Sequence, residues 1–176
     1  MSDYGIVTEA GSVRFERLLP APVERVWQYL TDPNLRRRWF AGGALEQKPG
    51  GRLQLIFRNS ELSGEGEEVP ERYLRYEGAE MEGRILRCEP QRLLVHSWDE
   101  GDSESEVSFE LIPEGDGTRL VLTHRRLSDQ AALRDVSGGW HSHLGVLEDL
   151  LAGRPPRPFW ATHAAAEAAY ADRIPG

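Results

Sequence analysis

Cysteine is almost absent from this chain of 176 residues, in which Cys88 is the only one. A single cysteine excludes a disulfide framework and a metal site built from several thiolates. Its ordinary role is that of a small apolar side chain in or near a strand. A chain of this length can bury about 70% of its unfolded surface. A single domain of this size therefore needs neither a disulfide nor a structural metal.

Long apolar runs and an excess of positive charge are also missing. No stretch approaches the roughly 18 apolar residues of a membrane span, and residues 1–5 lack the charged-then-apolar pattern of a signal peptide. Lys and Arg number 21 against 29 Asp and Glu, a net charge of −8. This balance argues against binding to nucleic acid or to an anionic membrane surface. We therefore expect a cytoplasmic protein, monomeric or homodimeric, that binds neither nucleic acid nor a membrane.

The clearest helical period lies near the C-terminal end of the chain, over residues 137–153. One apolar face recurs at spacings of four, four, three and four: Val136, Trp140, Leu144, Leu147 and Leu151. Gly153 stands where a left-handed C-cap is expected, and two prolines follow at 155–156. Ser128 is the expected N-cap. The helix either continues through the glycines at 138–139 or breaks there.

Alternation of apolar and polar residues predicts strands over 13–18, 52–58, 80–88, 92–98, 104–112 and 118–124. Short turns such as 113–117 imply that these strands form an antiparallel meander with one packed and one wet face. Two short helices are expected after the first strand, with Pro22 in the first turn of one and Asp32 capping the next. The arginines at 36–38 are assigned to a solvated helix face.

Two segments stand outside this pattern. Residues 59–72 carry five Glu, one Arg, two Gly and one Pro. This composition predicts a mobile acidic loop or a long hairpin tip, which is either a solvated connection or a gate over a pocket mouth. Residues 154–158 predict a stiff linker, and the alanine-rich residues 159–173 a short helix. We therefore divide the chain into a domain over 1–153 and a C-terminal extension over 154–176.

Five local strings in this order carry a resemblance to a known family. They are APVERVW at 21–27 with LTDP at 30–33 and Trp39; PGG at 49–51; Pro90 with RLLVHSW at 92–98; GDGTRL at 115–120; and Gly139-Trp140 with Leu144 and Leu147. Together they resemble the Aha-type domain (activator of heat shock protein 90 ATPase homologue) of the START/Bet v-like superfamily. The resemblance implies an α+β helix-grip fold, in which a curved antiparallel sheet of six to seven strands wraps one long C-terminal helix.

Strand parity and the helical face define the predicted lining of a cavity between sheet and helix. A sheet that curls around one helix leaves space at its open end, and such pockets are typically apolar with a few polar groups. The predicted cavity residues are Trp39, Phe40, Leu55, Phe57, His96, Trp98, Phe109, Leu122, His124, Trp140, His143, Leu144 and Leu147. The alternative interpretation of the same set is a filled core with hydrogen-bonded histidines.

No cofactor or metal is expected. His96 and His124 lie on strands with one strand between them, roughly 9–10 Å apart, too far for two zinc ligands. His141 and His143 point to different helix faces. No serine-nucleophile, phosphate-loop or dinucleotide motif occurs, and the carboxylates lack an inward pair.

Three functions therefore compete. The first is non-catalytic binding of a hydrophobic or aromatic small molecule by a carrier, sensor or sequestering protein. The second, which the resemblance also implies, is a chaperone-associated or other protein-interaction domain. It would use the exposed sheet face, or the acidic 99–116 edge against a basic partner. The third is a polyketide cyclase-like enzyme with an inward histidine as general base.

Overall fold

The computed structural model describes residues 2–63, 66–98 and 104–176. Its sheet contains seven strands: Ile6–Glu9 (β1), Ser12–Leu19 (β2), Arg52–Phe57 (β3), Ala79–Glu89 (β4), Leu93–Trp98 (β5), Ser105–Glu114 (β6) and Gly117–Arg125 (β7). Their order across the sheet is β1-β2-β7-β6-β5-β4-β3, and every pair is antiparallel. The predicted meander is confirmed. The edge strand β1 was not predicted, because all four of its residues are exposed and show no alternation.

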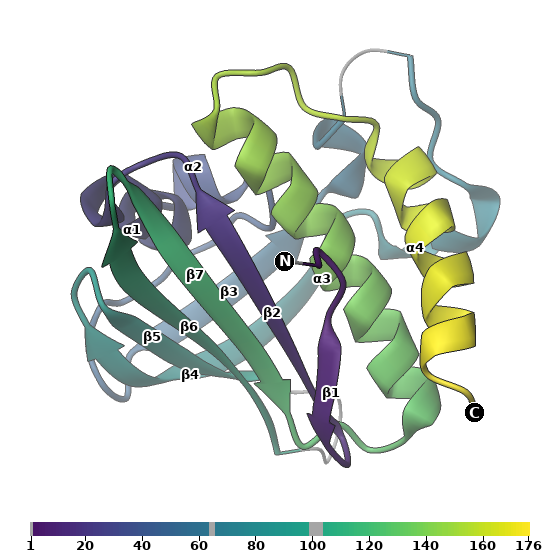
Figure 1. Ribbon diagram of the computed structural model, residues 1–176, viewed down its shortest axis with the longest axis horizontal. Coiled ribbons are helices and arrows are strands. Elements are labelled where there is room, and N and C mark those ends of the chain that lie inside the picture. Colours follow the sequence, from purple (N-terminus) through teal and green to yellow (C-terminus); the bar gives the residue numbers. More distant parts are fainter. Residues whose placement is uncertain (1, 64–65, 99–103) are drawn as a thin grey trace.

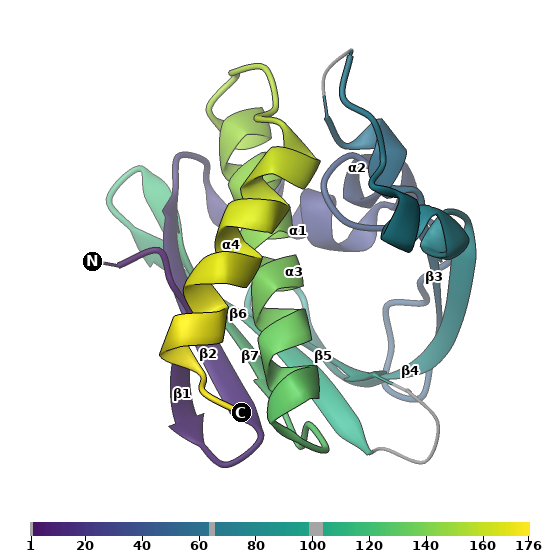
Figure 2. The same ribbon diagram turned by 90° about the vertical axis from the view of Figure 1, so that its right-hand side faces the viewer.

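Helices cover the concave face of this sheet. They are Val23–Thr31 (α1), Pro33–Arg36 (α2), Gln130–Leu151 (α3) and Phe159–Arg173 (α4), with short 3-10 helices at Asn59–Glu61 (η1) and Glu71–Tyr76 (η2). The curved sheet wraps α3, and α4 lies along the outer side of α3 (Figures 1 and 2). This arrangement is the helix-grip fold. None of the helices within the described ranges combines the length and apolar character needed to cross a membrane.

The long helix α3 begins one residue later than expected. Asp129, rather than Ser128, is its N-cap, and the Asp129 carboxylate accepts the amide of Ala132 at 2.8 Å. Asp129 has the extended backbone that a cap requires. The helix continues without interruption through the glycines at 138–139, and Gly153 adopts the expected left-handed conformation, with φ +72°. A single helix of 22 residues therefore runs along the concave face (Figure 1).

Strand register brings the inward side chains into rows across the sheet. One row joins Phe15 to Leu122, Leu122 to Phe109, and Phe109 to Leu94. A parallel row places His124 opposite Val107, and Val107 opposite His96. All of these side chains are buried. The rows form the core that α3 covers.

Arg36 departs from the expected solvated face, because its side chain is only 3% exposed. Its guanidinium donates to the carbonyl oxygens of Ala41, Gly42, Gly43 and Gln54 at 2.7–3.2 Å. Burial lowers the pKa of Arg36 to about 10. The arginine thereby holds the turn after α2 against β3, and the prediction of a solvated side chain at this position was wrong.

The C-terminal residues contribute to the same core. The predicted helix over 159–173 is confirmed as α4, and it buries Phe159, Trp160, Tyr170 and the following Ile174 in the main hydrophobic cluster. Asp149 of α3, 4% exposed, holds the linker through its carboxylate, which accepts from Arg154 and Arg157 at 2.7–3.3 Å. The linker is therefore anchored to the long helix immediately before α4 begins.

Candidate functional site

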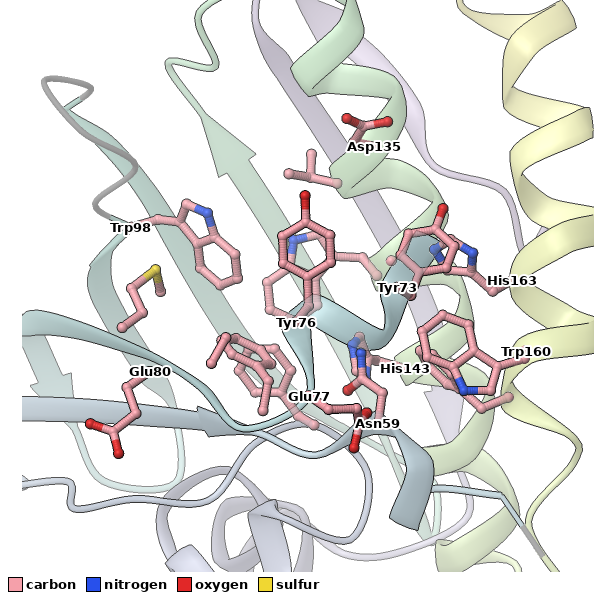
Figure 3. A pocket seen from close by; sticks show the side chains of 18 residues that line it. Asn59, Tyr73, Tyr76, Glu77, Glu80, Trp98, Asp135, His143, Trp160 and His163 are labelled. Atoms are coloured by element: carbon pink, nitrogen blue, oxygen red, sulfur yellow. The ribbon is translucent and has the colours of Figure 1, made fainter. Parts of the chain in front are cut away.

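A cavity of about 330 Å³ lies between α3, α4, the β3–β4 pair and the segment before β4 (Figure 3). Aromatic side chains from six different parts of the chain line it: Phe40, Phe57, Tyr73, Tyr76, Trp98, Trp140, Phe159 and Trp160. Asn59, Glu77, Glu80, Asp135, His143 and His163 add polar groups. Because the cavity joins many elements, its shape depends on the whole fold.

Ring contacts hold the aromatic walls in place. Trp160 stacks on Tyr73 with ring centroids 4.9 Å apart and planes 19° apart. On the opposite wall the rings of Phe40 and Trp140 approach to 4.8 Å. Offset and edge-to-face pairs of this kind stabilise by about 0.5–1.5 kcal/mol beyond the area they bury. The walls are therefore preorganised flat surfaces.

The segment that closes one side comprises residues 58–63 and 66–78, which we call the mouth segment. Its Glu67 carboxylate accepts the amides of Trp160 and Ala161 at 2.7 and 3.0 Å, and also the Ser63 hydroxyl. The Ser63 hydroxyl oxygen accepts the amide of Phe159 at 2.8 Å. Burial opposes ionisation of Glu67, but these hydrogen bonds lower its pKa overall. The mouth segment thus caps the N-terminus of α4 from a distant part of the chain.

A second tie joins the mouth segment to the middle of α4. The Glu167 carboxylate accepts from the Tyr73 hydroxyl and from Arg72, and lies 3.3 Å from Nδ1 of His163. Burial, together with the Glu167 charge, raises the pKa of Tyr73 to about 12, so the phenol stays protonated and donates. With contacts at the N-terminus and in the middle of α4, the mouth segment is docked on this helix and is not the solvated connection expected from its composition.

The predicted cavity residues fall into three groups. Phe40, Phe57, Trp98, Trp140 and His143 line the cavity. Trp39, Leu55, His96 and Phe109 instead surround a void of about 10 Å³ at the other end of the core, which Phe40 also touches. Leu122, His124, Leu144 and Leu147 are buried without lining either space.

The wall that sequence reasoning missed is contributed by the mouth segment and α4. It consists of Tyr73, Tyr76, Phe159, Trp160 and His163. The signal that could have identified this wall was the presence of aromatic residues in or beside two segments otherwise rich in charge (59–72) and in alanine (159–173). The first segment was expected to be a mobile connection or a gate and the second a short helix, and neither shows the periodicity that would place its rings.

The histidines of the core and the cavity are neutral. Trp140 Nε1 donates to Nδ1 of His124 at 3.0 Å, and burial lowers the pKa of His124 to about 3. Burial also lowers the pKa of His96 and of His143 to about 4. His143 Nδ1 lies 2.8 Å from the carbonyl oxygen of Trp39. A carbonyl only accepts, so Nδ1 of His143 carries the proton. Within the described ranges, no group of three or more His, Cys, Asp or Glu side chains could hold a metal.

Comparison with known proteins adds a family and several structures. The family model described as "Activator of Hsp90 ATPase homolog 1-like protein" matches residues 20–152. The solution NMR structure of a protein from Bordetella parapertussis is 48% identical, with a TM-score of 0.84, over 98% of this chain and 91% of that one.

CalU16 from Micromonospora echinospora is 29% identical in its crystal structure, with a TM-score of 0.70, over 98% of this chain and 96% of that one. A search of curated proteins gave no match. The likeness to both structures covers 98% of this chain and therefore includes the mouth segment and α4. These are the regions, around residues 59–72 and 154–176, that the sequence places outside the regular pattern of strands and helices.

Proposed function

The chain belongs to the activator of Hsp90 ATPase homolog 1-like family of the START/Bet v-like superfamily, and we propose that it binds a hydrophobic or aromatic small molecule between the sheet and α3. The fold of this family supports ligand binding in general. In this proposal the protein acts as a non-catalytic carrier, sensor or sequestering protein. The observation that carries the proposal is the cavity of about 330 Å³ with eight aromatic residues in its walls.

The size of the cavity limits the ligand. Small-molecule pockets typically measure about 300–1,000 Å³, so this one admits a ligand of about two or three fused rings. Burying roughly 200 Å² of apolar ligand surface is worth about 5 kcal/mol before the cost of lost motion. That gain alone corresponds to a dissociation constant of about 0.2 mM, and the lost motion weakens binding, so we expect simple aromatic probes to bind with dissociation constants of about 0.2 to 5 mM.

Gly139 offers a test of this site. It lies in α3 on the cavity wall, and a Cβ built on it meets nothing within 4 Å. A leucine at this position would project into the cavity. Calorimetric titration with 1-naphthalenemethanol should show binding to the native chain and at least a tenfold loss in Gly139→Leu.

The neighbouring glycine provides the matched control. Gly138 is buried outside the cavity lining, and its Cβ would meet Glu167 at an ordinary 3.9 Å. Gly138→Ala should therefore keep the native affinity and stabilise the helix by up to about 1 kcal/mol. Unchanged binding in Gly139→Leu, with the fold intact by circular dichroism, would place the probe elsewhere and refute the proposal.

The two alternative functions gain no specific support. Of the acidic 99–116 edge, residues 99–103 lie outside the described residues. Glu106 pairs with Arg125 and Arg126 at 3.6 and 3.7 Å, and Glu114 with Arg119 at 2.8 Å. This edge therefore has part of its charge compensated within the chain. For a cyclase, the inward histidines His96 and His124 are buried and do not line the cavity. His143 does line it, but its Nδ1 proton is donated to the Trp39 carbonyl.

A further inference from the structure

His143 is a buried polar side chain in the lining of the cavity, and only 6% of its surface is exposed. Its ring is held between two aromatic neighbours: the centroid of Phe40 lies 5.2 Å away in an edge-to-face contact, and that of Phe159 lies 4.9 Å away. Its Nδ1 donates to the carbonyl oxygen of Trp39 at 2.8 Å. These three contacts fix the orientation of the imidazole.

The proton on Nδ1 leaves Nε2 of His143 as a hydrogen-bond acceptor. Burial lowers the pKa of His143 to about 4, so the ring is neutral at pH 7 and carries one proton and one lone pair. The Trp39 carbonyl is its one hydrogen-bond partner within the described residues, and Trp39 lies outside the cavity lining. Because the two nitrogens of an imidazole point in nearly opposite directions, Nε2 is directed away from Trp39, toward the cavity.

Open space lies beside this acceptor. Gly139 precedes His143 by four residues and therefore shares its face of α3. Gly139 lines the cavity, and a Cβ built on it meets nothing within 4 Å. Figure 3 shows His143 between Trp98 on one side of the cavity and Trp160 on the other. A ligand that enters between these aromatic walls can therefore reach the imidazole.

Other polar atoms of the lining residues also lack partners. Asn59 Oδ1, Trp98 Nε1 and Trp160 Nε1 are buried and form no hydrogen bond within the described part of the chain. An unpaired buried polar atom lowers stability, so native structures rarely retain one without a reason. With Nε2 of His143, the set contains both acceptors and donors. A hydroxyl group both donates and accepts through one oxygen, whereas an ether or a ketone only accepts and an ammonium group only donates.

We propose that the cavity selects a phenol: an aromatic molecule whose rings lie among the tryptophans and tyrosines and whose hydroxyl group donates to Nε2 of His143. His143 is then a specificity-determining residue. Because the buried ring is too weak a base to remove the phenol proton, it binds the hydroxyl without catalysis. The inference rests on the proposed function, because it names the ligand class of that same cavity.

Two water-soluble probes of nearly equal shape test the inference: 6-hydroxyquinoline and its methyl ether, 6-methoxyquinoline. Both are neutral at pH 7.5, and only the first has a hydroxyl proton to donate. Each is titrated calorimetrically into the native chain. In a long-range ¹H–¹⁵N spectrum, the Nε2 resonance of His143 should shift upfield when the hydroxyl compound binds, because the nitrogen then accepts a hydrogen bond. The same resonance should move little with the ether.

His143→Asn separates the two roles of the side chain. Its amide N–H can replace Nδ1 as the donor to Trp39, but no atom of asparagine reaches the position of Nε2. The variant should bind 6-hydroxyquinoline about three- to tenfold more weakly, as expected for the loss of one hydrogen bond between neutral groups. Its affinity for 6-methoxyquinoline should stay within about twofold of the native value. His143→Gln, whose amide oxygen can take the place of Nε2, should recover most of the affinity for the hydroxyl compound.

His141→Asn, in the same helix but outside the cavity lining, is the control and should leave both affinities within about twofold. Equal weakening of both probes by His143→Asn would overturn the phenol inference while leaving a binding cavity. So would an Nε2 resonance that bound 6-hydroxyquinoline does not move, a measurement on the native chain that decides the question even where a variant does not fold. Failure of 6-hydroxyquinoline to bind where 1-naphthalenemethanol binds would also overturn the inference. Failure of all three compounds to bind would refute the proposed function and the inference with it.

Discussion

The two ends of the core have similar side chains but different packing. At one end, which we call the packed end, Trp39, Leu53, Leu55, His96 and Phe109 surround a void of about 10 Å³, the size at which a single water barely fits. At the other end the eight aromatic residues of the cavity surround about 330 Å³. Aromatic composition alone therefore does not determine whether a region is filled.

The difference in packing follows from the elements that face the sheet at each end. At the packed end, side chains of β3, β5 and β6 meet those of α1, of α2 and of the turn that follows α2. At the cavity the mouth segment and α4 are joined to each other by Glu67 and Glu167. Those hydrogen bonds hold the two elements together as one wall of the cavity.

Truncation of a large aromatic residue should separate the two ends most strongly. Trp39 is fully buried, and its Nε1 donates to the Tyr29 carbonyl at 2.8 Å. Trp39→Ala should lower the free energy of unfolding by about 3–5 kcal/mol, because it leaves a cavity in a packed core. Tyr76 lines the ligand cavity and is 48% exposed, so Tyr76→Ala should cost less than about 1 kcal/mol. Equal losses in urea unfolding would contradict the contrast.

Two adjacent arginines provide the next comparison. Arg36→Met at the packed end removes the donor to four backbone carbonyls. The loss of buried hydrogen bonds should cost about 3 kcal/mol. Arg37 is exposed, and Arg37→Met should change stability by less than about 0.5 kcal/mol. A similar cost for the two substitutions, measured by urea unfolding, would show that the buried network contributes little.

Arg36 also shows where the sequence reaches its limit. Strands, turns and the long helix were predictable because their apolar residues recur with the period of the element. A run of three arginines has no such period. Burial of the first one depends on carbonyls at 41–43 and 54 that only the folded turn brings together. Local pattern therefore identified the element but not the contacts of its polar side chain.

The candidate site was predictable to a similar extent. Strand and helix parity placed Phe57, Trp98 and Trp140 on the inner face, where they line the cavity. The same parity also placed His96 and Leu122 on the inner face, although neither lines the cavity. Parity identifies the inner face of the sheet, but it does not identify which part of that face borders the cavity. Tyr73 and Trp160 were missed because their positions depend on long-range hydrogen bonds between two aperiodic segments.

Acid should destabilise the core through its buried histidines. The folded pKa of His124 is about 3 against an ordinary value of 6.5, because burial favours the neutral ring. Its neutral form therefore stabilises the fold above pH 6.5, and this stability is lost as the pH falls from 6.5 toward 3. The expected slope is about 1.4 kcal/mol per pH unit.

His124→Asn keeps an acceptor for the Trp140 indole but cannot titrate in this range. Urea unfolding of this variant between pH 6 and 4.5 should show a shallower loss of stability by about that slope. His96 and His143 retain their own lowered pKa values, so a residual slope is expected. Parallel curves for the variant and the native chain would exclude His124 as a source of the acid sensitivity.

The smallest effect should come from the tie between the mouth segment and α4. Glu67→Ala removes the carboxylate that caps the amides of Trp160 and Ala161, and a lost N-cap costs about 1 kcal/mol. Because that tie is local, hydrogen exchange at these two amides should accelerate by about fivefold, while amides of the packed end change little. Glu68→Ala, at an exposed neighbour, should leave both amides unchanged. Faster exchange throughout the core in Glu67→Ala would instead mean that the cavity wall and the packed end unfold as one unit.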